Sequence, residues 1–317
     1  MKRRRLLTGY VAIALAIQGC ATVPYVGQGP HPQIQRGMPF LPVDALGNVT
    51  GIIGKILLLD WRFDNHAISE RTESYIVRFL DSHADRVGLT QVELNQYAPH
   101  HDLQRLFANH QVAWPYRVTL GLFTTLIVDV LLPGRVFPWG DYFNPWTNTV
   151  HVYSDHPAVA LHELGHAWDF GGRRLKGTYA FVRAFPFVNL YQEYVASNEA
   201  FDYFIEIGDQ EQETAAYKIL IPAYGSYVGS YLLFPFNYVG IAVGHVWGRS
   251  AAAYQAHVYR TQDERQQHED LAPPTPPSSN TPTGQEQPVV SPPAPEPPEP
   301  ASADTLPRLL LRPPETC

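Results

Sequence analysis

Two histidines four positions apart, His162 and His166, place the strongest constraint on how this chain can fold. Residues with this spacing lie on the same face of a helix, one turn apart. Apart from Glu163, the stretch between Val159 and Trp168 carries no charge, as a helix packed into a protein core requires. The sequence therefore predicts a largely buried helix here, with both imidazoles on one side.

These three polar residues have the types and the spacing of a zinc site. Two imidazoles on adjacent helical turns can bind one Zn²⁺ at about 2.0–2.1 Å each. Zinc lowers the pKa of a bound water to about 7, and a carboxylate beside the metal can accept the proton as that water attacks. We therefore predict His162 and His166 as metal ligands and Glu163 as the general base.

The flanking segments support a helix at this position. Gly171 and Gly172 follow the motif, where glycine commonly ends a helix. Residues 147–153 precede it and alternate, with Val150 and Val152 on one side and the residues between them on the other. Such alternation predicts a half-buried strand.

The run His162-Glu163-Leu164-Gly165-His166 resembles the motif of the zincin metallopeptidases. In zincins an edge strand lies above the metal-binding helix and pairs with the extended backbone of the substrate, and residues 147–153 are expected to form it. The metzincin type needs a further His in a fixed frame, which is missing after His166. The resemblance implies an α+β, mainly helical zincin-like domain with a small sheet, and hydrolysis of peptide bonds.

A third ligand is expected from the helix predicted over residues 190–204. Zincins of the gluzincin type take a Glu from such a helix, and Glu193 and Glu199 both qualify. The two acids are six residues apart, about 240° around the helix, so only one can face the metal. The face of Glu193 carries small residues that would let the two helices pack closely: Ala196, Ser197 and Ala200.

Two further likenesses bear on this choice. Glu193-x-x-Ala196-Ser197 resembles the Glu-x-x-Ala-Asp element of membrane-associated gluzincins related to CAAX prenyl proteases and heat-shock proteases, with Ser in place of Asp. Asn198-Glu199 is similar to the Asn-Glu pair of thermolysin-like enzymes. We predict Glu193 as the third zinc ligand and keep Glu199 as the alternative.

Residues outside the motif are assigned secondary roles. Asp169 follows His166 by three positions and His162 by seven, so it shares their helix face. We predict that it bonds a ligand imidazole and fixes its tautomer. A structural or surface position is favoured for four other histidines: His100, His101, His151 and His245. Of these, His245 could also be a transition-state donor. The candidates for stabilising an oxyanion are Tyr217, Tyr224 and Tyr227.

The N-terminus has the pattern of an export signal. Residues 2–5 are basic and residues 6–17 are almost entirely apolar, a run shorter than the roughly 20 residues that span a bilayer. Ile17-Gln18-Gly19-Cys20 resembles the lipobox of bacterial lipoproteins, in which the cysteine becomes the lipidated first residue. The resemblance implies a signal peptide over residues 1–19, lipidation of Cys20 and, because no Asp follows, a lipid anchor in the outer membrane facing the periplasm.

The rest of the chain divides into a folded part and a tail. The only other cysteine, Cys317, leaves no disulfide framework. We predict a tether over residues 20–42 and the metallopeptidase domain over residues 43–260. Residues 261–317 hold about half of the 29 prolines, a composition that predicts a disordered tail.

Residues 219–248 lack Asp, Glu, Lys and Arg. Their glycines recur every four residues, at Gly225 and Gly229 and again at Gly240, Gly244 and Gly248, a spacing that lets helices approach closely. The pattern predicts a helical hairpin, either packed in the core or dipping into the bilayer. A net charge of −7 without a basic stripe argues against nucleic acid as a partner.

These patterns predict a zinc-dependent peptidase of the bacterial cell envelope that acts on a protein or peptide substrate. Two alternatives stay open. In the first, the chain is a non-enzymatic envelope lipoprotein that keeps a structural zinc and works as a scaffold or assembly factor. In the second, the zinc centre hydrolyses an amide that is not a peptide bond.

Overall fold

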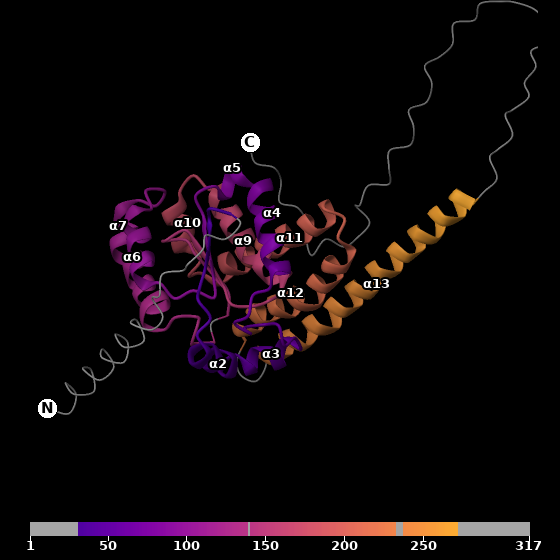
Figure 1. The fold of residues 1–317 in the computed structure, drawn as a ribbon, viewed down its shortest axis with the longest axis horizontal. Coiled ribbons are helices and arrows are strands. Elements are labelled where there is room, and N and C mark those ends of the chain that lie inside the picture. The colour runs from indigo at the N-terminus through magenta and orange to yellow at the C-terminus, as the bar shows by residue number, and fades with distance from the viewer. Residues whose placement is uncertain (1–30, 139, 233–236, 272–317) are drawn as a thin grey trace, which may run out of the picture. The chain divides into compact units, whose positions relative to one another are not determined.

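The computed structural model describes residues 31–138, 140–232 and 237–271. The predicted signal peptide, Cys20 and the segment 272–317 lie outside the described residues. Most of the described chain is helical, with one small mixed sheet, which confirms the predicted α+β class (Figure 1).

The described strands are β1 (Ile34–Arg36), β2 (Gln91–Leu94), β3 (Tyr142–Asn144) and β4 (Thr149–Val152). The helices before the histidine motif are α2 (Leu41–Thr50), α3 (Ile52–Leu58), α4 (Glu70–Ser82), α5 (Ala84–Val87), α6 (Pro99–Ala108), α7 (Trp114–Tyr116) and α8 (Leu122–Thr125), with wider π-helical turns at η1 (Arg117–Gly121) and η2 (Leu126–Leu131). The motif and the helices after it are α9 (Pro157–Gly171), α10 (Lys176–Val182), α11 (Pro186–Glu206), α12 (Gln210–Ser230) and α13 (Asn237–Leu271).

The described strands form a sheet in the order β1-β2-β4-β3. β2 runs parallel to β1 and to β4, and β3 runs antiparallel to β4 with Phe143 opposite Val150. The prediction for residues 147–153 was therefore wrong in two respects. β4 is an internal strand and all four of its residues are buried, because its polar side chains meet other buried polar groups instead of water. The edge strand before the motif is β3.

Helix α9 lies among the other elements of the fold. His156 caps its N-terminus by accepting a hydrogen bond from the Ala158 amide at 3.1 Å, and Pro157 occupies the first turn, where proline is tolerated. Helices α4, α5, α11 and α12 contact α9, as do β3 and β4. Nearly all of its residues are buried, so its polar side chains must find partners inside the protein.

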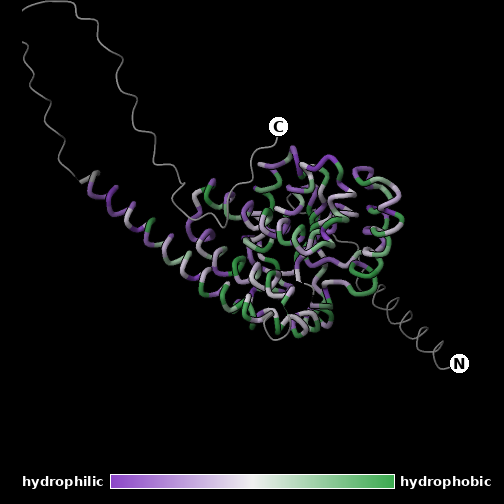
Figure 2. Tube along the Cα trace, turned by 180° about the vertical axis from the view of Figure 1, so that it is seen from behind, coloured by the Kyte–Doolittle hydropathy of each residue, from purple (hydrophilic) through white to green (hydrophobic). Residues whose placement is uncertain are grey.

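The folded part extends beyond both predicted boundaries. β1 begins at Ile34, inside the predicted tether 20–42, and pairs with β2. A three-residue strand is too short to leave a periodic signal in the sequence. At the other end α13 runs to Leu271 instead of ending at residue 260, because the first proline of the tail is Pro273. Figure 2 shows α13 becoming hydrophilic toward this end.

Residues 219–230 belong to α12 and residues 237–248 to α13, and the two helices pack against each other through their glycines. A Cβ at Gly244 would lie 2.7 Å from the Pro222 Cα, and a Cβ at Gly225 would overlap the backbone of Gly240. The glycines therefore permit direct backbone contact between the two helices, as both alternatives for this hairpin require.

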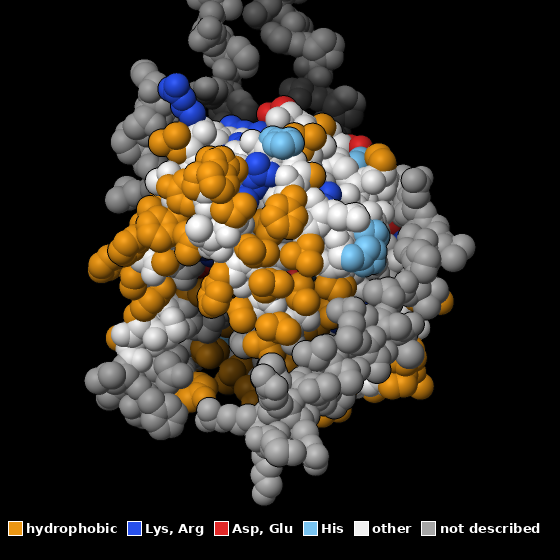
Figure 3. Space-filling model, turned by 90° about the vertical axis from the view of Figure 1, so that its left-hand side faces the viewer, with side chains coloured by type: hydrophobic (Ala, Val, Ile, Leu, Met, Phe, Trp, Pro, Cys, Tyr) orange, Lys and Arg blue, Asp and Glu red, His pale blue; other side chains and the backbone are white. Residues whose placement is uncertain are grey.

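Large apolar side chains are also exposed. Figure 3 shows many of them gathered on the side of the molecule that carries α6 and α7 in Figure 1. On α2 and α3, Leu41 and Ile53 are 79% and 68% exposed. No single helix in the described ranges has the length and hydropathy of a membrane span, and α2 and α3, bent by 47°, reach them only as a pair.

Candidate metal centre

α9 and α11 cross where both carry small residues. A Cβ at Gly165 would lie 2.6 Å from the carbonyl oxygen of Ala196 and 3.0 Å from its Cα, so the two backbones touch at this glycine. Ala196 and Ala200 are fully buried on α11. This close approach brings Glu193 against the histidines of α9, on the face that the small residues of α11 predicted.

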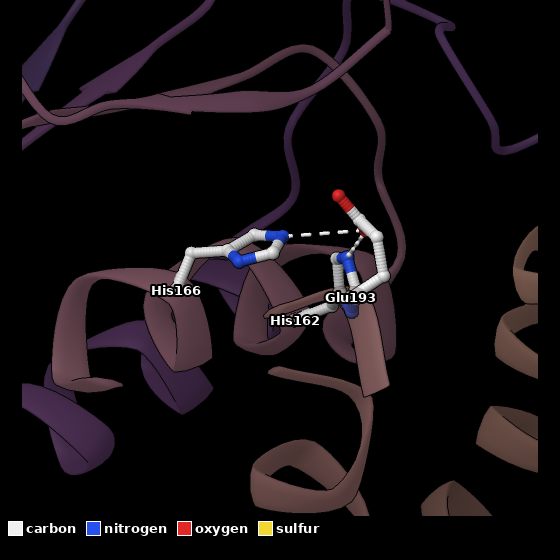
Figure 4. Close-up of side chains that lie close together, drawn as sticks. All are labelled: His162, His166 and Glu193. Carbon is white, nitrogen blue, oxygen red and sulfur yellow. Dashed lines mark hydrogen bonds and ion pairs between the residues drawn. The ribbon is translucent and has the colours of Figure 1, made fainter. Parts of the chain in front are cut away.

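His162, His166 and Glu193 converge on one point (Figure 4). Glu193 Oε2 lies 3.1 Å from His162 Nε2 and 3.4 Å from His166 Nε2. Donor atoms that each lie about 2.0–2.1 Å from a tetrahedral zinc ion are about 3.3–3.4 Å apart. The two distances to Glu193 are close to this value, and all three ligand atoms lie within 4.8 Å of one another. The three side chains could therefore hold a metal ion. All three are buried.

Glu199, the alternative ligand, faces away from this point. Its carboxylate lies 3.2 Å from His83 Nε2, at the junction of α4 and α5. The hydrogen bond that His83 donates to the Glu199 carboxylate raises the pKa of His83. Glu199 therefore takes part in an ion pair that joins α11 to the α4–α5 segment.

The role predicted for Asp169 was wrong. Its carboxylate accepts a hydrogen bond from Arg173 Nε at 2.9 Å and another from the Tyr179 hydroxyl. Asp169 shares the helix face of the histidines, but it lies one turn closer to the C-terminus of α9, where Arg173 and Tyr179 are within reach. It therefore ties the end of α9 to α10.

Ser197 and Arg183 each form a hydrogen-bonding contact with a candidate ligand. Ser197 Oγ lies 3.2 Å from His162 Nδ1; when Nε2 binds a metal, Nδ1 carries the proton and can donate it to this oxygen. Ser197 is the residue that replaces Asp in the Glu-x-x-Ala-Asp likeness. Arg183, between α10 and α11, donates to Glu193 Oε1 and leaves Oε2 to the imidazoles. Sequence reasoning missed Arg183 because it belongs to no motif.

The protonation states of these groups suit a cation. Burial lowers the pKa of His166 to about 4, so its imidazole is neutral, as a metal ligand must be. Burial would raise the pKa of Glu193, but His166, Arg183 and hydrogen bonds from both imidazoles hold it well below its usual range. Glu193 is therefore ionised at neutral pH.

Glu163 lies beside the convergence point, with Oε1 3.9 Å from His162 Nε2. Burial raises the pKa of Glu163 well above its usual range, and the negative charges of Glu193 and Asp141 add to the shift. The backbone amide of Phe143 in β3 hydrogen-bonds the Glu163 carboxylate. Glu163 therefore connects the candidate metal centre to the edge strand.

A cavity of about 270 Å³ adjoins the centre. His162, Glu163 and Glu193 lie in its wall together with Tyr224 and Tyr227 of α12. The negative charge of Glu193, followed by burial, raises the pKa of Tyr227 well above its usual range. The Tyr227 hydroxyl therefore keeps its proton, which it donates to the Glu193 carboxylate.

Three other residues noted in the sequence as possible site residues lie away from the candidate metal centre. Tyr217 donates to Glu213 at 3.1 Å. His245 Nε2 lies 2.7 Å from the backbone oxygen of Leu57. His151 is only 2% exposed and belongs to a separate buried cluster.

Comparisons with protein families, with curated proteins and with solved structures found no match for this chain. The likeness to zincins therefore depends on the motif, on the convergence of Glu193 with the two histidines, and on the edge strand beside Glu163.

Proposed function

We propose that this chain is a zinc-dependent peptidase in which His162, His166 and Glu193 hold the metal and Glu163 is the general base. The observation that carries the proposal is the meeting of two imidazole nitrogens and one ionised carboxylate oxygen, at zinc-like separations, in the wall of a cavity that Glu163 also lines. When bound, zinc would polarise the substrate carbonyl and lower the pKa of water.

The number of ligands favours a catalytic centre over a structural one. Structural zinc sites normally have four protein ligands, whereas catalytic sites have three and leave one position open. Three donors converge here, and the cavity of about 270 Å³ adjoins them. This observation supports an enzyme more than the scaffold or assembly-factor alternative.

The residues around the metal would divide the work. Glu163 is a buried carboxyl group beside the proposed metal. The positive charge of bound zinc would favour its ionised form, which is the form that accepts a proton. Tyr227, whose hydroxyl hydrogen-bonds Glu193 in this structure, would turn that hydroxyl to the oxygen on which negative charge develops once zinc occupies the Glu193 carboxylate. Arg183 positions the Glu193 carboxylate by bonding its other oxygen. These roles are separate, so each can be removed on its own.

The edge strand supports a peptide as the substrate. β3 is at the border of the described sheet and runs antiparallel to β4. An extended peptide can add to such an edge through main-chain hydrogen bonds. Because Phe143 of β3 bonds Glu163, a peptide aligned along this strand would lie close to the general base. A small amide that is not a peptide would gain nothing from the strand.

The proposed location is the outer membrane, facing the periplasm, through a lipid on Cys20. The lipobox supports this location, and the exposed apolar side chains of α2 and α3 suit a domain held close to a bilayer.

The test compares purified wild-type protein with Glu163→Gln and Tyr224→Phe. Zinc content and cleavage of a peptide library, read by mass spectrometry, are measured for each. We expect zinc in all three proteins, no cleavage by Glu163→Gln, and cleavage by Tyr224→Phe within about tenfold of wild type. Zinc in the wild type without cleavage would favour the scaffold, and equal cleavage by Glu163→Gln would exclude its role as base.

A further inference from the structure

A second cluster of buried ionisable side chains lies apart from the cavity described above. It consists of Glu93 on β2, Asp102 on α6 and His151 on β4, and Asp129 on η2 adjoins it. His151 Nδ1 lies 3.6 Å from Glu93, and His151 Nε2 lies 3.9 Å from Asp102 and 3.8 Å from Asp129. Each of the four residues is no more than 2% exposed.

Most of the polar atoms in this cluster have no hydrogen-bond partner among the described residues. These atoms are both carboxylate oxygens of Glu93, Oδ1 of Asp102 and both ring nitrogens of His151. A buried polar group without a partner costs about 1–3 kcal/mol, and more when it is charged. Five such atoms lie in one cluster, and a bound cation would supply the partner that they lack.

In the segment that contributes Asp129 to this cluster, polar side chains are buried and apolar side chains are exposed. On α8 and η2, Thr125 and Asp129 are 0% and 2% exposed, while Phe123 and Leu126 are 68% and 38% exposed. The segment therefore turns polar residues inward and apolar residues outward, the reverse of the usual arrangement. The Tyr142 hydroxyl donates to Asp129 at 2.8 Å and fixes its carboxylate toward the cluster.

The charge of the cluster favours a cation. It contains three carboxyl groups, and the nearby Arg105 bonds Thr149 Oγ1 at 2.9 Å and the Asn148 carbonyl at 2.8 Å. Burial raises the pKa of Glu93 to about 8 and the pKa of Asp129 to about 7, so these carboxyl groups hold protons when no further positive charge is near. A divalent cation would displace those protons and balance the carboxylates. Burial lowers the pKa of His151 to about 3, so its imidazole is neutral and able to bind a metal.

We propose that Glu93, Asp102 and His151 bind a second divalent metal ion, with Asp129 as the fourth donor. Each ring nitrogen of His151 lies 3.6–3.9 Å from a carboxylate of the cluster. When one nitrogen binds the ion, the carboxylate beside the other nitrogen can use one oxygen to bind the ion and its second oxygen to accept the imidazole proton. Mixed carboxylate and imidazole donors suit first-row ions such as Mn²⁺ and Zn²⁺.

The geometry assigns this ion a structural role. Four protein donors and full burial describe a closed site. Neither the cavity beside the candidate metal centre nor any of the three other best-formed cavities of the described residues has Glu93, Asp102 or His151 in its wall. The ion would tie together β2, β4, α6 and η2. It would stabilise the sheet from which β3 reaches Glu163.

The test counts metal ions in the full chain after chelation and reconstitution with Zn²⁺ or Mn²⁺. We expect two ions in the wild type, one in His162→Ala, one in Glu93→Gln and none in the double variant. Metal should raise the Tm of His162→Ala by about 5–10 °C at a free concentration about 100 times Kd. The same addition should leave the Tm of the double variant unchanged.

The outcomes separate this proposal from that of the catalytic centre. If His162→Ala binds no metal and its Tm does not change when metal is added, the second site does not exist. This variant leaves every residue of the cluster intact, so the result cannot come from damage to the cluster. If the wild type and His162→Ala each bind one ion and Glu93→Gln binds none, the cluster is a metal site and the proposed catalytic centre fails. A metal-free Glu93→Gln protein more stable than metal-loaded wild type would show that the carboxyl groups hold protons instead.

Discussion

Replacement of Gly165 by alanine tests whether the contact between α9 and α11 sets the candidate metal centre. The added Cβ would lie 2.6 Å from the Ala196 carbonyl oxygen, and 3.4 Å is the near limit of an ordinary contact. The helices must therefore separate by about 0.8 Å. Backbone atoms form the contact, so no side chain can rotate to relieve it.

This displacement is large for a metal site, which tolerates ligand distances within about ±0.2 Å. We expect Gly165→Ala to weaken zinc binding about tenfold or more. Overpacking costs about 1–3 kcal/mol, and the better helix propensity of alanine offsets about 1 kcal/mol. The net loss in unfolding free energy is at most about 2 kcal/mol, or about 4–8 °C in Tm.

Zinc affinity is measured by competition with a chromophoric chelator, in the Glu93→Gln background so that a single centre is counted. Gly172→Ala is the matched control. Gly172 has ordinary helical φ and ψ, and its added Cβ would meet only the far end of the Arg86 side chain, at 3.3 Å. The reasoning is refuted if Gly165→Ala binds zinc as tightly as Gly172→Ala.

Three further predictions concern other residues. Glu193→Ala should lose most zinc affinity in the same competition assay, whereas Glu199→Ala should keep it and lose only the contact to His83; the opposite result would restore the thermolysin-like alternative. In metal-free protein, Glu163→Gln should raise the Tm, since burial raises the pKa of Glu163. The folded value lies above the ordinary value of 4.5, so the stability that this group contributes is lost as pH rises toward the folded pKa; the advantage of Gln should therefore grow with pH, and a constant difference would contradict the shift. Cys20→Ser should abolish acyl labelling, and labelling that persists would exclude the lipobox.

The sequence predicted the parts of the site that depend on helical periodicity. The spacing of His162 and His166 and the small residues beside Glu193 each specify a helix face, and the two faces meet in the structure. Ser197 was noted in the sequence only as a departure from a family element. Its hydrogen-bonding distance to His162 Nδ1 could be recognised only once the helices were placed.

Other features depend on tertiary contacts that periodicity does not encode. Alternation in residues 147–153 predicted a strand with one face in water, but its polar face meets buried acids from β2, α6 and η2. A strand whose polar face meets water and a strand whose polar face meets buried acids have the same alternating sequence pattern. Arg183 reaches Glu193 from a connection between helices, where no repeat fixes the direction of a side chain. Asp169 shared the right face but had closer partners.

The most direct test of the account is a crystal structure of the zinc-loaded wild-type chain, with anomalous scattering recorded at the zinc edge. The account predicts a peak about 2.0–2.1 Å from Nε2 of His162, from Nε2 of His166 and from a carboxylate oxygen of Glu193. A zinc-loaded crystal with no peak at this point, or a peak bound by Glu199 in place of Glu193, would contradict it.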